Sequence, residues 1–153
     1  KIELKYMDDI VTYKFTESEK ERIISIIKDG LEARDDIIFA YIYGSLIDPE
    51  MTFYRDIDIG IYVADMEKAK EWNYDIRIGI DIEKMLRSEG FSIPVDVRVI
   101  NASDVLYVHK VIQGRLLFVK DEDIWADFVV YVSMRHDDIY PLWEHFMKEA
   151  LTT

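Results

Sequence analysis

The run from Ile37 to Tyr43 constrains the fold more than any other part of the sequence, because all seven residues are apolar. Most of them are β-branched or aromatic, and the run is short. These are the properties of a strand that is buried within a sheet. The sequence therefore predicts a buried strand over residues 37–43.

Gly44 and Ser45 follow this run directly and mark the end of the expected strand. Glycine has no Cβ, so the backbone at Gly44 can approach a ligand closely. If a short helix begins at Ser45, its unpaired N–H groups and the positive end of its dipole face the same place, and both favour a phosphate. The pair therefore predicts a phosphate-binding turn.

After ten intervening residues, Asp56 and Asp58 open a second strand pattern. Side chains of a strand alternate between two faces, so the two aspartates share one face. The other face is apolar and consists of Ile57, Ile59, Ile61 and Val63. The Cα atoms of two such aspartates lie about 7 Å apart. This spacing suits two Mg²⁺ ions roughly 3.5–4 Å apart, which carboxylates hold together with substrate phosphates.

A third carboxylate, Asp96, projects from a later strand pattern. The opposite face of that pattern is apolar and consists of Val95, Val97 and Val99. An alternative is that these aspartates are only the solvated side of half-buried strands. Asp accounts for 18 of the 153 residues, and Asp121 and Asp123 repeat the spacing at an expected helix start. The combination of the Gly-Ser turn, both strand patterns and the third aspartate favours a functional site.

Gly44-Ser45-x(10)-Asp56-x-Asp58, with Asp96 on a later strand, resembles the motif set of the nucleotidyltransferase superfamily, whose core is similar to the palm of DNA polymerase β. The short chain resembles the minimal nucleotidyltransferases (MNT), many of which are the antitoxin half of HEPN–MNT toxin–antitoxin pairs. Two further segments are similar to the family's third-aspartate strand and its helix–Gly–strand continuation, namely 95–101 and 111–119. The resemblance covers about residues 20 to 135. It implies a palm-like α/β (α+β) fold with a mixed sheet flanked by helices.

The resemblance also implies a reaction. ATP binds as substrate with its phosphates at Gly44 and Ser45, Asp56 and Asp58 coordinate two Mg²⁺ ions, and Asp96 holds the second metal and orients the acceptor. AMP is transferred to a Tyr hydroxyl of the partner HEPN toxin, which makes the protein an adenylyltransferase. Two alternatives stay open: a non-catalytic antitoxin of this fold that acts by stoichiometric contact, and a small-molecule nucleotidyltransferase of the aminoglycoside-modifying kind.

Arg55 departs from the family pattern, which often has a small residue before the first aspartate. An arginine at this position either reaches the triphosphate as a nucleotide-binding residue or lies in solvent at the end of the strand. The sequence leaves both interpretations open.

Length and charge limit the partners. A chain of 153 residues predicts a single domain over 1–153, with a core at about 20–120 and a C-terminal helical segment at about 123–150. The net charge of −12 and the lack of a basic patch argue against direct binding of nucleic acid. An acidic surface suits a basic HEPN toxin, although it serves solubility equally well. Without a signal peptide pattern or an apolar stretch near about 18 residues, we expect no membrane contact and a cytoplasmic location.

The remaining segments predict short strands and helices. Residues 1–15, from Ile2 and Leu4 onward, contain two short strand-like alternations, and Thr16 with Glu19 forms a capping box for a helix to about Ala33. Residues 65–90 give conflicting signals. The isoleucines at 76, 78, 80 and 82 occupy every second position, as in a strand. The apolar residues at 72, 76 and 80 are four apart, as on one face of a helix, and the length of the segment favours the helix.

A long helix is expected from Asp123 onward, with Pro141 breaking or kinking it. Aromatic residues are frequent in this segment. They either join the core or offer an exposed apolar surface to a partner or to a second copy of this chain.

Overall fold

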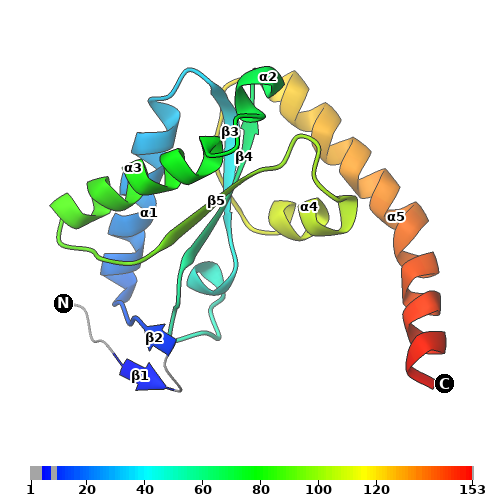
Figure 1. The fold of residues 1–153 in the computed structure, drawn as a ribbon, viewed down its shortest axis with the longest axis horizontal. Coiled ribbons are helices and arrows are strands. Elements are labelled where there is room, and N and C mark those ends of the chain that lie inside the picture. Colours follow the sequence, from blue (N-terminus) through cyan, green and yellow to red (C-terminus); the bar gives the residue numbers. More distant parts are fainter. Residues whose placement is uncertain (1–4, 8–9, 153) are drawn as a thin grey trace.

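The computed structural model describes residues 5–7 and 10–152 (Figure 1). The strands are β1 (Lys5–Met7), β2 (Ile10–Thr12), β3 (Ile37–Tyr43), β4 (Ile57–Val63), β5 (Val95–Val99) and β6 (Arg115–Val119). The helices are α1 (Glu17–Glu32), α2 (Met66–Ala69), α3 (Tyr74–Ser88), α4 (Val105–Ile112) and α5 (Glu122–Thr152), with a 3₁₀ turn, η1 (Ser45–Ile47), after β3. Ile2 and Leu4 of the expected N-terminal strand lie outside the described residues.

The main sheet has four strands in the order β5-β4-β3-β6. β3 pairs antiparallel with β4 and with β6, whereas β4 and β5 run parallel. Six of the seven residues of β3 are buried, and Ile38 is the exception. The predictions of a buried strand at 37–43 and of a mixed sheet are confirmed. β1 and β2 form a separate two-stranded ribbon.

Helices cover both faces of the sheet (Figure 1). One face packs against α1 and α3, and this layer contains the isoleucines of β4 together with Ile23, Ile27 and Leu31 of α1. The other face packs against α4 and the first part of α5, where Val108, Val111 and Val132 meet the aromatic side chains of β3. Burial on both faces explains why β3 is apolar throughout.

The helix starts follow local signals. The Thr16 hydroxyl accepts a hydrogen bond from the Glu19 N–H at 3.1 Å, and the Glu19 carboxylate accepts one from the Thr16 N–H at 2.9 Å, so the predicted capping box is present. The expected helix at 65–90 exists as two pieces, because the chain leaves helical geometry between Ala69 and Tyr74. Asp65 caps the first piece by accepting from the N–H groups of Glu67 and Lys68.

Pro141 does not break α5, which is continuous from Glu122 to Thr152. Figure 1 shows the helix changing direction along its orange and red part. Proline removes one intrahelical hydrogen bond and commonly bends a helix that continues on both sides of it. Of the two predicted outcomes, a break or a kink, the helix shows the second (Figure 1).

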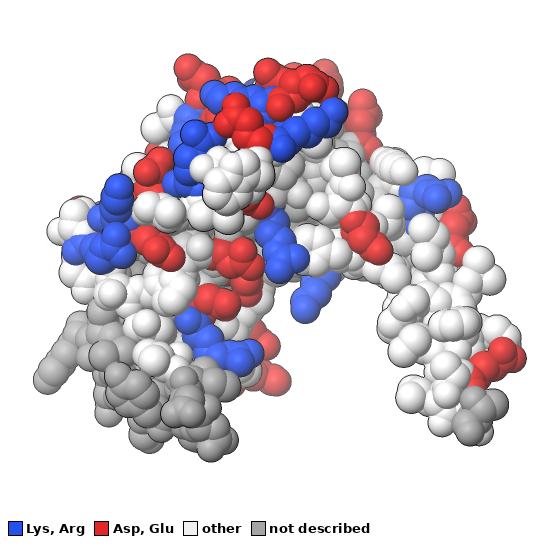
Figure 2. Space-filling view, in the orientation of Figure 1, with Lys and Arg blue, Asp and Glu red and all other residues white. Residues whose placement is uncertain are grey.

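The aromatic residues of α5 divide between two environments. Trp125 and Phe128 pack against the second core layer. The outer half of α5, defined here as residues 140–152, carries exposed apolar side chains at Tyr140, Leu142, Trp143, Phe146, Met147 and Leu151. In Figure 2 this part of the helix forms a largely uncharged arm that extends from the body. Within the described part of the chain, no helix is both long and apolar enough to span a membrane.

Candidate active site

Gly44 turns the chain at the end of β3, with φ of 84° and ψ of −156°. A Cβ at this position would lie 2.5 Å from Oδ2 of Asp58, so glycine is the residue that fits beside that carboxylate. Ser45 then begins η1, and its carbonyl oxygen accepts a hydrogen bond from the Asp48 N–H at 3.2 Å. The predicted short helix after Gly44 is thus a 3₁₀ turn, and it lies next to Asp58.

Of the two aspartates of the motif, Asp58 lies within β4, on the face that the sequence assigned to it. Asp58 lies opposite Tyr43 of β3, and Asp56 directly precedes the strand. The other face of β4 is buried in the first core layer through Ile57, Ile59, Ile61 and Val63. The apolar residues therefore hold the strand in a register that presents Asp58 beside the Gly44 turn.

Asp96 comes from β5, which runs parallel to β4 and pairs Asp96 directly with Asp58. Neighbouring strands lie about 4.8 Å apart, so two opposite side chains on one face are close neighbours. The side chain of Asp96 is 44% exposed, whereas Asp58 is partly buried. The structure thus places the third predicted carboxylate beside Asp58, on the same face of the sheet.

The electrostatics of Asp58 reflect this grouping. Burial, together with the nearby charges of Asp56 and Asp96, raises the pKa of its carboxyl to about 6. The positive charges of Lys110 and Arg98 lower the pKa but do not offset the rise. The carboxylates therefore repel one another, which is the arrangement that a bound cation would relieve.

The donors at this place are all carboxylate oxygens, which suit Mg²⁺. Within residues 5–7 and 10–152, no group of three or more His, Cys, Asp or Glu side chains is placed to hold a metal ion. Mg²⁺ commonly takes one or two carboxylates and completes its shell with water and substrate phosphates. An Mg²⁺ ion at Asp56, Asp58 and Asp96 would therefore need water and substrate phosphates in addition to these carboxylates.

An arginine and two tyrosines adjoin Asp96. The Arg98 Nε lies 3.5 Å from Asp96 Oδ2, and the guanidinium lies 5.4 Å from the centre of the Tyr107 ring. The hydroxyl groups of Tyr107 and Tyr43 are hydrogen-bonded to each other. Burial, followed by this hydrogen bond, raises the pKa of Tyr43, and the Tyr107 and Asp96 charges raise the pKa of Arg98.

Sequence reasoning missed these three residues, although two of them carried a usable signal. Arg98 follows Asp96 by two residues, so period 2 places both on one face of the strand. Tyr43 likewise shares a face of β3 with Phe39 and Tyr41, the face that packs against α4 and α5. Tyr107 carried no such signal, because its position depends on how α4 packs against the sheet.

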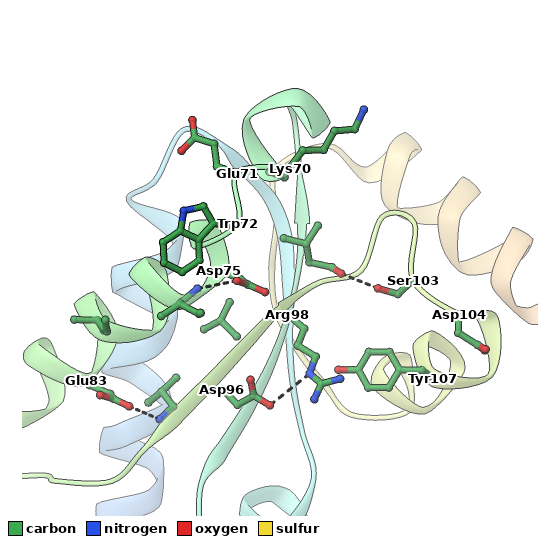
Figure 3. A pocket seen from close by; sticks show the side chains of 16 residues that line it. Lys70, Glu71, Trp72, Asp75, Glu83, Asp96, Arg98, Ser103, Asp104 and Tyr107 are labelled. Carbon is green, nitrogen blue, oxygen red and sulfur yellow. Dashed lines mark hydrogen bonds and ion pairs between the residues drawn. The ribbon is translucent and has the colours of Figure 1, made fainter.

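A cleft of about 930 Å³ lies beside these residues, between α3 and α4 along β5 (Figure 3). Asp96, Arg98 and Tyr107 line it. Gly44, Ser45, Asp56 and Asp58 do not. Asp96 therefore lies between those four residues and the cleft. Arg55, the remaining predicted site residue, is exposed in the bend before Asp56.

The three histidines are not spaced like the ligands of a metal ion, and they lie in structural or surface positions. His109 of α4 and His136 of α5 stack with ring centroids 3.5 Å apart. Burial and the neighbouring His136 lower the pKa of His109. His145 lies on the exposed outer half of α5, 3.2 Å from Glu149. The stacked pair joins α4 to α5, and none of the three lines the cleft.

Comparison with known proteins gives one family match. The family model described as "Polymerase beta, Nucleotidyltransferase" matches residues 25–123, which is more than half of the chain. A search of curated proteins found no significant match.

Several solved structures have the same fold. The chain is similar to one in the complex of tri-AMPylated Shewanella oneidensis HEPN toxin with MNT antitoxin, at 15% identity and a TM-score of 0.60, covering 88% of this chain and 97% of that one. It is similar to a chain of the MntA–HepT toxin–antitoxin crystal structure, at 13% identity and a TM-score of 0.60, covering 89% and 99%.

A third similar chain comes from a crystal structure of the toxin–antitoxin with AMP-PNP, at 15% identity and a TM-score of 0.63, covering 86% and 98%. At such identities the likeness concerns the fold. The predicted palm-like fold is confirmed.

Proposed function

The chain belongs to the polymerase beta nucleotidyltransferase family, and on that premise we propose that it transfers AMP from ATP to a hydroxyl acceptor. The acceptor is a Tyr hydroxyl of a HEPN toxin, so the protein is an antitoxin that acts as an adenylyltransferase. One similar complex supports this acceptor, since it contains an AMPylated HEPN toxin with an MNT antitoxin, and another supports the nucleotide, since it contains AMP-PNP. The chain's net charge of −12 suits a basic partner.

The proposal assigns Mg²⁺ to Asp56 and Asp58, with Asp96 as the further ligand of a second ion. Bound Mg²⁺ would neutralise negative charge on the triphosphate and on the oxygens that attack and leave at phosphorus. The observation that carries the proposal is the grouping of the three carboxylates, in which Asp56 and Asp96 contribute to raising the pKa of Asp58 to about 6.

The chain's own groups have separate tasks. The N–H groups of the Gly44 turn and the Ser45 hydroxyl bind the β- and γ-phosphates, and Arg55 extends this contact from the exposed bend. Asp96 accepts the proton of the attacking hydroxyl, and Arg98 orients that carboxylate from 3.5 Å. The acceptor oxygen bonds to the α-phosphorus, and the bond from that phosphorus to the β-phosphate oxygen breaks and releases pyrophosphate.

Calorimetric titration of ATP with Mg²⁺ tests the nucleotide site. We expect binding that requires Mg²⁺ and is lost in the double variant Asp56→Asn/Asp58→Asn, because both changes remove anionic ligands. Asp121→Asn/Asp123→Asn is the matched control, since this pair has the same spacing at the exposed start of α5. Unchanged binding in the first double variant would refute the assignment.

A second candidate function is neutralisation of a toxin by stoichiometric contact. The exposed apolar side chains of the outer half of α5 favour it, because apolar surface of this kind commonly mediates association. Co-expression with a HEPN toxin separates the two functions. If Asp56→Asn/Asp58→Asn still neutralises the toxin and Trp143→Ser/Phe146→Ser does not, contact is the mechanism. The opposite result establishes catalysis.

A further inference from the structure

The outer edge of β5 forms one side of the cleft beside Asp96. Among the described strands, β5 pairs only with β4, so half of its backbone groups point away from the sheet. Ile57 N–H donates to the Pro94 carbonyl, and Ile100 N–H donates to the Ile61 carbonyl. In a parallel ladder, these two hydrogen bonds mean that the backbone N–H and C=O groups of the even-numbered residues of β5 face β4. Val95, Val97 and Val99 therefore direct their N–H and C=O groups outward.

Both ends of this edge are already occupied (Figure 3). The Val95 N–H donates to Glu83 of α3 at 2.8 Å, and the Val99 carbonyl accepts from the Ser103 hydroxyl at 2.8 Å. α3 also approaches the Val95 carbonyl so closely that a Cβ on Gly79 would lie 3.0 Å from it. Within the described part of the chain, the Val97 N–H and C=O and the Val99 N–H have no such partner. The open stretch spans the residues that flank Arg98.

One wall of the cleft is an exposed apolar row on and before α3. Trp72, Ile76 and Ile80 are 86%, 54% and 43% exposed. Their spacing of four residues places them on one flank of the helix. Ile78 and Ile82 are buried in the core instead, so the four alternating isoleucines form two stripes with different surroundings. The first stripe is free to contact a ligand in the cleft.

The opposite wall is polar and contains the proposed acceptor-activating group. Asp96 and Arg98 come from β5 and Tyr107 comes from α4 (Figure 3). The charged residues that line the cleft are five acidic and two basic: Glu71, Asp75, Glu83, Asp96 and Asp104 against Lys70 and Arg98. A basic ligand therefore matches the cleft better than an acidic one.

We propose that the β5 edge binds an extended, basic peptide segment of the acceptor protein as an additional strand, and that this segment presents its Tyr beside Asp96. The proposal rests on the proposed function for the identity of the acceptor. Unpaired main-chain groups of an edge recognise an extended peptide. Side chains of such a strand alternate, so one set lies on Ile76 and Ile80 while the next reaches Asp96.

A nucleobase fits this place less well. It has no repeating donors and acceptors that match Val97 and Val99. The residues assigned to the triphosphate, Gly44 and Ser45, lie outside the lining of the cleft. The cleft is therefore the side from which the acceptor approaches Asp96.

Fluorescence anisotropy with labelled pools of short Tyr-containing peptides tests the proposal, without nucleotide. One pool has Lys and Arg around the Tyr, a second has Asp and Glu, and a third repeats the basic pool with N-methylated backbone amides. We expect the basic pool to bind. N-methylation should weaken its binding by about fivefold or more, because each lost main-chain hydrogen bond is worth about a factor of five. The acidic pool should bind more weakly.

The variant Ile76→Ser/Ile80→Ser removes the apolar wall at exposed positions, and we expect it to weaken binding of the basic pool by about tenfold or more. Val130→Ser/Met134→Ser is the matched control, because these apolar residues of α5 are exposed to 56% and 64% and lie away from the cleft. It should bind the pool like the wild type. Equal binding of the methylated and unmethylated pools, or no binding of any pool, would overturn the proposal.

Titration of ATP with Mg²⁺ into the same proteins separates this proposal from the proposed function. If ATP binds and no peptide does, the peptide site alone is wrong. If the basic pool binds and ATP does not, the peptide site stands and the transferase assignment is wrong. If Ile76→Ser/Ile80→Ser loses ATP and keeps the peptides, the cleft belongs to the nucleotide and the peptide proposal is overturned.

Discussion

Replacing Asp58 with Asn should stabilise the protein at neutral pH, because the carboxylate is ionised there at a cost. Its pKa rises from 3.8 to about 6, chiefly through burial and then through Asp56 and Asp96. A shift of this size corresponds to about 3 kcal/mol of unfolding free energy. Solvent screening at this partly buried site reduces the expected gain to about 1–2 kcal/mol. Asparagine has nearly the same shape, so the site beside Gly44 keeps its packing.

The stability that Asp58→Asn gains over the wild type increases as the pH rises. Below about pH 4 the Asp58 carboxyl is protonated in both states and costs nothing. As the pH rises from about 4 to about 6, the unfolded chain releases this proton before the folded chain does. The wild type therefore loses stability over this interval relative to Asp58→Asn, and the difference stays constant above it.

Urea denaturation of both proteins at pH 4, 5, 6 and 7.5 measures this difference directly. We expect a higher unfolding free energy for Asp58→Asn at pH 7.5 and similar values near pH 4. Asp127→Asn is the control, because this aspartate is exposed on α5. If Asp58→Asn is less stable than the wild type at pH 7.5, or if the difference is the same at every pH, the ionised Asp58 carboxylate does not carry the cost that its burial and its acidic neighbours imply.

Three further predictions concern the same site and its support. Mg²⁺ should raise the melting temperature of the wild type at pH 7.5 but not that of Asp56→Asn/Asp58→Asn, which differential scanning fluorimetry with and without EDTA would show; equal shifts would argue against a metal site at these residues. Gly44→Ala should lower the unfolding free energy by about 2–4 kcal/mol, since it combines a positive φ with a Cβ that would lie 2.5 Å from Asp58. Gly90 has a φ of 90° and open space around it, so Gly90→Ala should lower the unfolding free energy by about 1 kcal/mol in the same denaturation assay. Thr16→Ala should lower the unfolding free energy by about 1 kcal/mol through loss of the capping box, and an unchanged value would mean that the cap does not contribute.

Local patterns were sufficient for the parts of the molecule that depend on neighbours in the chain. The run of apolar residues at 37–43 identified β3, and period 2 assigned Asp58 and the isoleucines of β4 to opposite faces. Thr16 and Glu19 identified the start of α1. These features follow from backbone geometry and hydrogen bonding within a few residues, so they can be read from the sequence.

Tertiary structure decided what depends on contacts between distant segments. The parallel pairing of β4 with β5 places Asp96 opposite Asp58, and the packing of α4 brings Tyr107 to Arg98. The alternating isoleucines of α3 were ambiguous because both helical stripes are apolar, and only the sheet determines that Ile78 is core while Ile76 lines the cleft. Residues 44, 45, 56 and 58 thus identified the candidate site from sequence alone. The open edge of β5 depends on the whole fold, because no second strand in the described part of the chain pairs with it.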